Sequence, residues 1–496
     1  MKKRTYILIG ILLFSMIPAF IPVVFASKTS IGNNTGFLKA EMQSPYCGVG
    51  TNFGSGRGKV PFSVDMVDAD KVWSKGTGVY IAVLDTGLLS NWRDILPQGN
   101  IKWKLGKGFT HEVGWDPIAE DYTFGPLIER GFEVDDWKGD GHGTHVTSTI
   151  TGYLYDGSAG KFWVRGVAPN VKIIPVLVLD NWYVPDAPED YQFLSGGTDP
   201  MVAAGINYIA DIAHYLHGPV IISMSLGGPE PAPIIKDAID YAISEGVIVI
   251  ASAGNSGEDG MGWPGAYPEV ISVGAAGWTE QWVPVVDHDY SSSTGEAIGW
   301  SNREFWLNDV PENLHNTDVW GNEWQVYLED FSSRPIFDHP LGEQELDVCT
   351  PGACIVGPYK PEFADFEDYF GYYYVWGTSQ ACPHVSGIAA LILQRFPYLN
   401  QWQMETILKA AASTLPMDFD SYPGEEDYNL AYVYDPIYDY LSSYYWGFSY
   451  YPWEFVWEDD DFGAGFLRAD RAMMFAYLYW HYWHWHHHHH GPHCRC

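Results

Sequence analysis

Five short runs of apolar residues, each of strand length, constrain the fold of this chain more than any other feature. They are continuous and rich in β-branched residues, whereas half-exposed strands alternate apolar with polar residues. The runs are Val79–Leu84, Val171–Leu179, Val220–Met224, Val247–Ala251 and Val270–Val273. Continuous runs of this kind are typical of strands in parallel sheets, which are buried on both faces.

Amphipathic segments with helical spacing separate several of these runs. In residues 200–216, Val202, Ile206 and Ile209 fall on one helical face, and residues 234–244 show the same spacing. Because strands and helices alternate, the predicted fold class is α/β, with a mainly parallel, doubly wound sheet, helices on both faces and irregular insertions. Reactive groups in such folds lie in loops at the carboxyl ends of the strands.

The charge balance excludes one class of function. The 496 residues include 62 Asp and Glu but only 27 Lys and Arg, which gives a formal net charge of -35. Binding to nucleic acid through phosphates needs clustered Lys and Arg, so we expect no nucleic-acid partner. The imbalance comes from scarce basic residues, because only 18% of the residues are charged against about 25% in a typical protein.

Three glycine-rich segments carry reactive side chains in a suggestive order. Asp85 ends the first strand in Leu-Asp-Thr-Gly, His142 lies in Asp-Gly-His-Gly-Thr-His, and Ser379 lies in Gly-Thr-Ser-Gln-Ala-Cys-Pro-His before an Ala-rich helix. A serine hydroxyl becomes nucleophilic only when an imidazole takes its proton and a carboxylate holds the imidazole. These residues therefore predict a nucleophilic triad.

With these motifs, the chain resembles the subtilisin-family serine proteases over roughly Val60 to Met474. The resemblance implies that Asp85 orients the histidine, that His142 is the general base and that Ser379 is the nucleophile. It also implies protein or peptide substrates, no organic cofactor, and hydrolysis through an acyl-enzyme.

Further segments match the family pattern. Asn255, in Ser-Ala-Gly-Asn-Ser-Gly, matches the amide of the oxyanion hole, and 463–469 resembles the closing motif of the family. The segment that pairs with substrate is matched by Ser223, Ser225, Leu226 and Gly227.

Other polar residues in and near these motifs are expected to serve the structure. His145 and His384 are interpreted as structural. Calcium is common in the family, and Asp94 falls where the family often has a calcium ligand, with a solvated surface carboxylate as the alternative.

The termini predict export and a set of segment boundaries. Lys2, Lys3 and Arg4 precede an apolar stretch, which is typical of a signal peptide and would be a membrane anchor if it were not cleaved. An extracellular location is therefore expected. The predicted segments are a leader at 1–26, an arm at 27–59 that is short for the usual prodomain, a peptidase domain at 60–475 with an insertion at 278–376, and a His-, Trp- and Cys-rich tail at 476–496.

Cysteine and histidine patterns add two expectations. Cys349 and Cys354 are close enough in sequence to form a disulfide in an exported protein, and Cys382, within an apolar helix, is expected to be a buried thiol. The tail combines His481, His484 and 486–490 with two cysteines, a composition that fits transition-metal binding, and a purification tag or a solvated tail are the alternatives.

The sequence as a whole predicts a secreted serine endopeptidase. The alternatives are a narrow-specificity processing peptidase, with access restricted by the insertion, and an occluded surface-binding protein. The scarcity of Lys and Arg predicts tolerance of an acidic medium, because such a surface gains less positive charge as carboxylates protonate.

Overall fold

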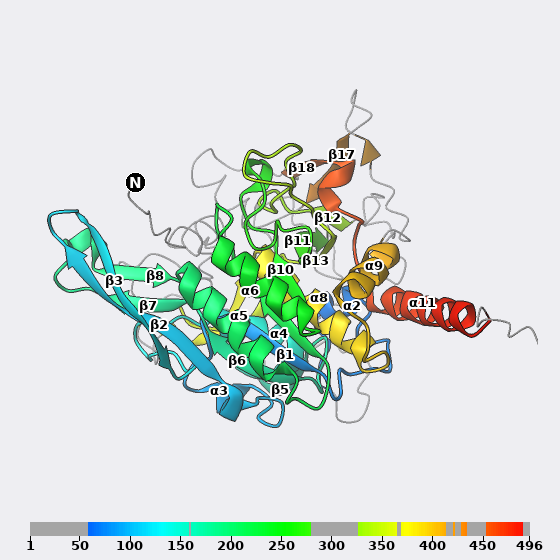
Figure 1. The fold of residues 1–496 in the computed structure, drawn as a ribbon, viewed down its shortest axis with the longest axis horizontal. Coiled ribbons are helices and arrows are strands. Elements are labelled where there is room, and N and C mark those ends of the chain that lie inside the picture. The colour runs from blue at the N-terminus through cyan, green and yellow to red at the C-terminus, as the bar shows by residue number, and fades with distance from the viewer. Residues whose placement is uncertain are drawn as a thin grey trace, which may run out of the picture.

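The computed structural model describes residues 58–157, 160–278, 326–364, 369–412, 420–421, 428–433 and 453–489. Within these residues the main sheet has nine strands, in the order β12-β11-β10-β9-β1-β6-β2-β3, with β13 paired to β11 (Figure 1). Its strands are β1 (Tyr80–Asp85), β2 (Lys107–Asp116), β3 (Asp121–Arg130), β6 (Lys172–Leu177), β9 (Val220–Met224), β10 (Ile248–Ser252), β11 (Ile271–Trp278), β12 (Val326–Leu328) and β13 (Val348–Pro351).

The centre of this sheet is parallel, as predicted. Strands β6, β1, β9, β10 and β11 pair in parallel with one another. All residues of β1, β9, β10 and β11 are buried, so the continuous apolar runs are the strands of the core. Antiparallel pairing appears at the two edges, where β3 pairs with β2 and β12 pairs with β11. The predicted α/β class is therefore confirmed.

Helices cover both faces of the sheet. One face carries α5 (Asp199–Ala213) and α6 (Pro233–Ser244), which pack side by side in front of the sheet in Figure 1. The other face carries α4 (His142–Thr151) and α8 (Thr378–Leu393), which pack against each other, and α9 (Gln401–Ala412) lies beside α11 (Ala469–His489). Thr198 caps α5 by accepting a hydrogen bond from the Met201 N–H, and a proline follows in its first turn.

Short helices and hairpins complete the chain. The short helices are α2 (Phe62–Met66), α3 (Trp92–Ile95), and the 3₁₀ turns η1 (Trp103–Leu105), η2 (Glu189–Tyr191), η3 (Gly257–Asp259) and η5 (Asp459–Phe462). The remaining strands are β4 (Gly152–Gly157), β5 (Gly160–Arg165), β7 (Asp180–Tyr183), β8 (Phe193–Gly196), β14 (Ile355–Tyr359), β15 (Gly371–Val375), β16 (Asp420–Ser421), β17 (Tyr428–Val433) and β18 (Trp453–Glu458).

Two of the hairpins extend away from the body of the molecule. The β2–β3 and β7–β8 hairpins project together at the left of Figure 1. They are joined by side-chain contacts, since the Tyr122 hydroxyl donates to the Tyr191 carbonyl and the rings of Phe124 and Trp182 meet edge to face. The sequence pattern did not predict them, because β3 is largely exposed and the strands of both hairpins mix polar with apolar residues and lack a continuous apolar run.

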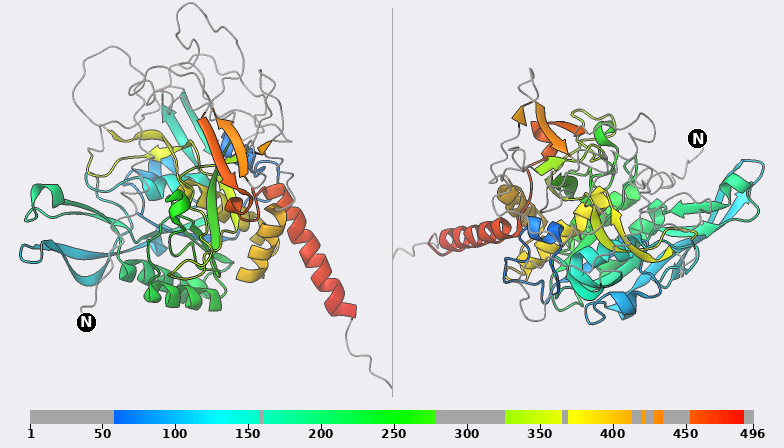
Figure 2. Two further views of the ribbon diagram at one scale, coloured as in Figure 1. Left: turned by 90° about the horizontal axis from the view of Figure 1, so that it is seen from above. Right: turned by 180° about the vertical axis from the view of Figure 1, so that it is seen from behind.

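Several predicted segments fall partly outside the described residues. The leader at 1–26 and nearly all of the arm at 27–59 lie outside them. The described parts of 278–376 add β12 and β13 to the main sheet, and their β14–β15 hairpin packs against α4. The helix α11 runs from the body into the predicted tail and projects outward (Figure 2). Among the described helices, none combines the length and apolar character needed to cross a bilayer.

The predicted disulfide between Cys349 and Cys354 is wrong. The two side chains are buried and are not bonded to each other. Cys349 lies within β13, where its Sγ is held against β11, so closely that a Cβ on Gly274 would lie 2.6 Å from it. Cys354 follows the turn with a φ of 55°, so the sheet and the turn fix the two side chains separately. Cys382 is a free buried thiol, as expected.

A lysine surrounded by three acids joins α9 to the sheet. Lys409 Nζ lies 3.0 Å from Asp347 Oδ1 and 3.6 Å from Glu405 Oε1, and it also pairs with Glu345. Burial raises the pKa of Asp347 to about 6. Burial, together with the charge of Asp347, raises the pKa of Glu405 to about 7. One lysine therefore does not fully balance three partly buried carboxyl groups.

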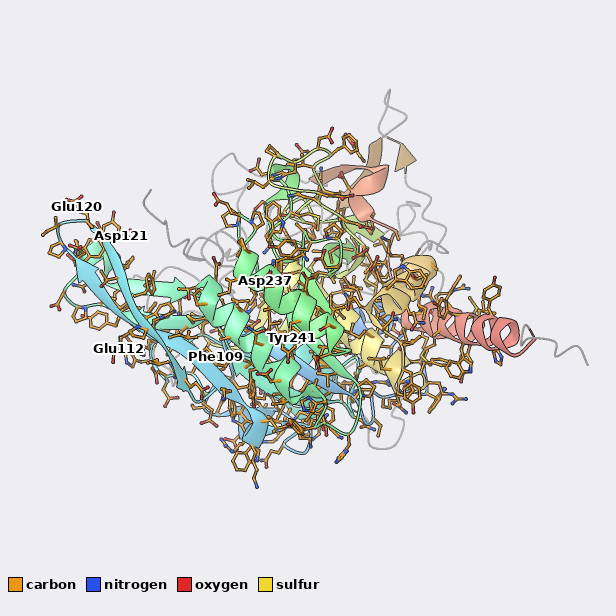
Figure 3. All side chains as sticks on the ribbon, viewed as in Figure 1. Phe109, Glu112, Glu120, Asp121, Asp237 and Tyr241 are labelled. Carbon is orange, nitrogen blue, oxygen red and sulfur yellow. The ribbon has the colours of Figure 1, made fainter. Side chains whose placement is uncertain are left out.

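This cluster should make the protein more stable in mild acid. Because the folded-state pKa values of Asp347 and Glu405 are raised, their contribution to stability is largest below their ordinary pKa values and is lost as pH rises through about 6 and 7. The buried, neutral His145 and His384 act in the opposite direction, because protonation below pH 6.5 favours the unfolded chain, so the test is the difference between two proteins. In urea unfolding, the free energy of unfolding of Glu405→Gln should gain less, relative to the unaltered protein, as the pH is lowered from 8 to mild acid. Asp237→Asn, which alters an exposed carboxylate on α6 (Figure 3), is the control. An identical pH profile for Glu405→Gln and the unaltered protein would contradict this account.

Candidate active site

Asp85 and His142 meet at the carboxyl edge of the central strand. Asp85 is the last residue of β1, and His142 is the first residue of α4. His142 Nδ1 donates a hydrogen bond to Asp85 Oδ1 at 2.7 Å, and the Thr86 N–H donates to the same oxygen at 2.7 Å. Because the carboxylate holds the proton on Nδ1, the neutral imidazole keeps Nε2 as its basic nitrogen.

The glycine after His142 allows this close approach. The Gly143 N–H donates to Thr86 Oγ1 at 2.9 Å. A Cβ on Gly143 would lie 2.4 Å from the Gly87 carbonyl oxygen and 3.1 Å from Asp85 Oδ1. Any larger residue would push α4 away from β1, so the glycine of the histidine motif is required for the Asp85–His142 contact.

Ser379 lies in the first turn of α8, which packs against α4. The preceding Gly377 has a φ of 151°, and a Cβ there would lie 2.7 Å from Gln380 Oε1. The Ser379 hydroxyl donates to the Ser225 carbonyl at 3.3 Å. Ser379 is 9% exposed, His142 4% and Asp85 0%, so the serine is the part of this set nearest to solvent.

The side-chain amide of Asn255 is oriented by the residue before Ser379. The Thr378 N–H and hydroxyl both donate to Asn255 Oδ1, each at 2.9 Å. Since a backbone N–H can only donate, the oxygen of the amide must face Thr378, and the NH₂ group points elsewhere. A Cβ on Gly377 would lie 3.4 Å from Asn255 Nδ2, which places the NH₂ group beside the start of α8.

The segment predicted to bind substrate follows β9. The Ser225 hydroxyl donates to the Ser379 carbonyl at 2.8 Å, which ties this segment to the first turn of α8. Leu226 and Gly227 come next, and Gly228 pairs with Trp263 in an antiparallel bridge. Ser223 lies deeper, because its Oγ accepts a hydrogen bond from Ser386 of α8 and is fully buried. Its side chain joins the sheet to the helix.

Asp140 is a second carboxyl group close to the histidine. Its Oδ1 accepts a hydrogen bond from the His142 N–H at 2.9 Å, and the side chain is buried. Burial works to lower the pKa of His142, but the charge and hydrogen bond of Asp85 and the charge of Asp140 outweigh it, so the pKa is raised. Burial raises the pKa of Asp140 itself.

The other two histidines of the motifs support the backbone. Burial lowers the pKa of His145 to about 3 and that of His384 to about 4, so both are neutral near pH 7. His145 Nε2 donates to the Ile355 carbonyl, and His384 Nδ1 donates to the Gln380 carbonyl. These bonds hold the β14–β15 hairpin and the first turn of α8.

Thr86, Asp140 and Thr378 are site residues that sequence reasoning missed. Each flanks a predicted site residue, and each acts by accepting or donating a hydrogen bond to its neighbour or to a backbone group. The sequence feature that could have identified them is their position inside the motifs of Asp85, His142 and Ser379. Their roles depend on which backbone groups lie opposite them, and this is decided by the fold.

The predicted metal ligand does not lie among clustered acids. Asp94 is exposed on α3. Within the described ranges, the acids close enough to share a metal ion are Glu345, Asp347 and Glu405. Lys409 contacts all three of these carboxylates, so a calcium ion would have to displace its ammonium group.

The chain is similar to known proteins over most of its length. The model of the subtilase family matches residues 76–428. Subtilisin DY of Bacillus licheniformis is 26% identical over 367 residues, which cover 73% of this chain and 94% of that protein. Fervidolysin of Fervidobacterium pennivorans is 28% identical over 349 residues, which cover 69% of this chain but only 38% of fervidolysin.

Among solved structures, sphericase aligns with a TM-score of 0.46 and 26% identity, covering 72% of this chain and 91% of that one. The family match extends over most of the chain and includes the segments that carry Asp85, His142, Asn255 and Ser379. The chain belongs to the subtilase family and is a subtilisin-like serine peptidase.

Proposed function

We propose that this chain is an exported endopeptidase that cleaves proteins and peptides with Asp85, His142 and Ser379. The observation that carries the proposal is the buried 2.7 Å hydrogen bond from His142 Nδ1 to Asp85 Oδ1. His142 begins α4, and α4 packs against α8, whose first two residues are Thr378 and Ser379. A general base needs a fixed tautomer and a carboxylate that stabilises its charged form, and Asp85 supplies both.

The proton follows a defined route in this mechanism. The Ser379 hydroxyl turns from the Ser225 carbonyl to His142 Nε2 when substrate is bound, and Oγ attacks the scissile carbonyl as Nε2 takes the proton. The imidazolium then gives that proton to the leaving amine, so that an acyl-enzyme remains on Ser379. Water, deprotonated by the same nitrogen, releases the acyl group and restores the serine.

Asn255 and the first turn of α8 stabilise the negative charge that develops on the carbonyl oxygen. The Ser379 N–H lies in the first helical turn, where N–H groups have no acceptor within the helix. Thr378 fixes the Asn255 amide with its NH₂ group free to donate. Both donors are held in place before substrate arrives, which is what makes such a site effective.

Substrate would lie along the segment after β9. Ser225, Leu226 and Gly227 follow a strand end and are anchored to α8 through the Ser225 hydroxyl. An extended peptide placed beside this segment would bring its carbonyl to Ser379. Ser223 takes part indirectly, by holding α8 against the sheet.

Three further expectations remain predictions. Export through residues 1–26 would be tested by the N-terminal residue of the secreted protein.

Calcium binding at Asp94 would be supported if a chelator lowered the melting temperature and Asp94→Asn removed that effect. Metal binding by the tail would be contradicted if removal of 481–496 left the bound zinc or nickel unchanged.

Replacing Ser379 by Ala should nearly abolish peptide hydrolysis, because the proposed acyl-enzyme forms on its hydroxyl. The expected fall in kcat is about 10⁶-fold, the size known for subtilisin, a member of this family. Asn255→Ala should lower kcat by about 10² to 10³, again the range known for subtilisin. Ser256→Ala, at an exposed neighbour, is the control. If a serine-directed phosphonate failed to label Ser379 in the folded protein, the assignment would be overturned.

The rate of hydrolysis should fall in acid at a pH above the usual value for histidine. His142 must be neutral to accept a proton, and its pKa is raised from 6.5. The acidic limb of the kcat/KM profile should therefore lie above pH 6.5, and Asp140→Asn should shift it downward, because the amide keeps the oxygen that accepts the His142 N–H but carries no charge. Asp135→Asn, on the same loop but more exposed, should leave the limb in place. A limb that Asp140→Asn does not move would show that Asp140 only caps the start of α4.

A further inference from the structure

Four aromatic side chains form a closed cluster, here called the aromatic rim, that consists of Trp137, Tyr183, Phe193 and Phe363. The ring centroids are 5.7 Å apart for Trp137 and Tyr183, 5.3 Å for Tyr183 and Phe193, 4.7 Å for Phe193 and Phe363, and 6.1 Å for Phe363 and Trp137. Each ring therefore contacts two others, at distances typical of favourable aromatic pairs. The rings come from three separate parts of the chain and meet only in the folded protein.

The aromatic rim faces solvent although it is apolar. Trp137 is 48% exposed, Tyr183 43% and Phe193 51%. Scattered exposed aromatic residues are ordinary, but a contiguous group of half-exposed rings is typical of a binding surface, where Trp, Tyr and Phe are enriched. The rings already support one another, so a ligand would meet a preformed surface.

Hydrogen bonds connect the aromatic rim to the loop that carries His142. The Phe363 N–H donates to the Lys138 carbonyl at 3.2 Å, and the Gly141 N–H donates to the Lys360 carbonyl at 2.8 Å. Gly141 immediately precedes His142. Residues 138–141 and 360–363 therefore lie side by side, and they connect the aromatic rim to the site proposed for catalysis.

The backbone at Phe363 is strained. Its φ is 50°, in the left-handed region that large side chains rarely adopt. The ring of Phe363 packs between Phe193 and Trp137, and this packing holds the backbone in the left-handed conformation. Strain that the surrounding structure maintains is concentrated at functional sites, so the position of this ring is a second indication that the rim has a use.

The hairpin loops beside the aromatic rim are acidic, and Lys138, which follows Trp137, pairs with Asp135. The loop between β7 and β8 carries Asp186, Glu189 and Asp190 and has no Lys or Arg. The adjoining β2–β3 hairpin carries Glu112, Glu120 and Asp121, which Figure 3 labels along its outer part. A ligand with positive charge would be attracted to this region, and Lys or Arg side chains stack favourably on Trp and Tyr.

We propose that the aromatic rim binds a segment of the polypeptide substrate, outside the residues next to the cleaved bond, that carries an aromatic side chain beside Lys or Arg. This inference rests on the proposed function and adds a preference among substrates. The aromatic side chain would pack against the exposed ring faces, and the basic side chain would lie toward the acidic hairpin loops. Proteins that expose such segments when unfolded would be cleaved in preference to polar ones.

The test compares peptides of equal length that share one cleavable sequence. One set carries a Phe-Lys segment a few residues before or after the cleaved bond, and the other carries Ser-Gly there. The unaltered protein should show a kcat/KM about tenfold higher for a Phe-Lys peptide, the effect of about one well-packed aromatic anchor. The preference should disappear in the Trp137→Ala, Phe193→Ala double variant. In the unaltered protein it should decrease as the salt concentration rises. The control is the Tyr398→Ala, Trp402→Ala double variant, which removes rings that are 87% and 63% exposed elsewhere on the surface and should keep the preference.

The outcomes separate this inference from the proposed function. If no peptide is cleaved and Ser379 is not labelled by a phosphonate, the proposed function fails. If peptides are cleaved but the unaltered protein has no preference, or the rim variant keeps it, the inference fails. It also fails if the rim variant changes the mass of the protein in light scattering, since the rim would then join two copies of the chain. Trp137→Ser alone, at an exposed loop position, repeats the test if the double variant does not fold.

Discussion

The hydrogen bond between Asp85 and His142 depends on how closely the end of β1 approaches the start of α4. That approach is set by packing around a glycine, because Gly143 leaves no room for a side chain between the helix and the Gly87 carbonyl. The strand is fully buried and the helix is packed against α8, so neither element can shift on its own. The orientation of the histidine therefore depends on the rigidity of the central sheet, and so does the proposed activation of Ser379.

Carboxyl groups have different effects in different parts of this acidic protein. Asp85 and Asp140, beside the histidine, raise the pKa of His142, and under the proposed mechanism this restricts hydrolysis to higher pH. Asp347 and Glu405, around Lys409, have raised pKa values themselves, so their contribution to stability is greatest in acid. The fold and the chemistry are therefore expected to have different pH ranges. Tolerance of an acidic medium, expected from the composition, stays a prediction.

The hairpins around the site give the family fold a surface of its own. Strands β7 and β8 bring Tyr183 and Phe193 beside Trp137 and Phe363, next to the loop that leads to His142. These residues lie outside the shared motifs, and their effect is on the choice of substrate. A conserved mechanism and a chain-specific preference are compatible because the first depends on the strand ends and the second on the inserted hairpins.

The buried parts of this protein could be predicted from the sequence to a large extent. Continuous apolar runs identified β1, β6, β9, β10 and β11, because a strand buried on both faces must be apolar throughout. The motifs indicated that Asp85 ends β1 and that His142 and Ser379 lie at the starts of helices. The hairpins could not be predicted, because their strands mix polar with apolar residues and pairing between such strands leaves little trace in the pattern of hydrophobic residues.

The sequence by itself determined the order of strands and helices, the chemical character of the site and the family. Only the tertiary structure decided which groups surround each side chain. It showed that Thr378 fixes the Asn255 amide, that Cys349 and Cys354 are held apart, and that Ser223 serves the core. It also assembled the aromatic rim from three distant segments. The physical reason is that hydrogen bonds and ring contacts depend on distances between residues far apart in the chain, and local patterns carry no record of those distances.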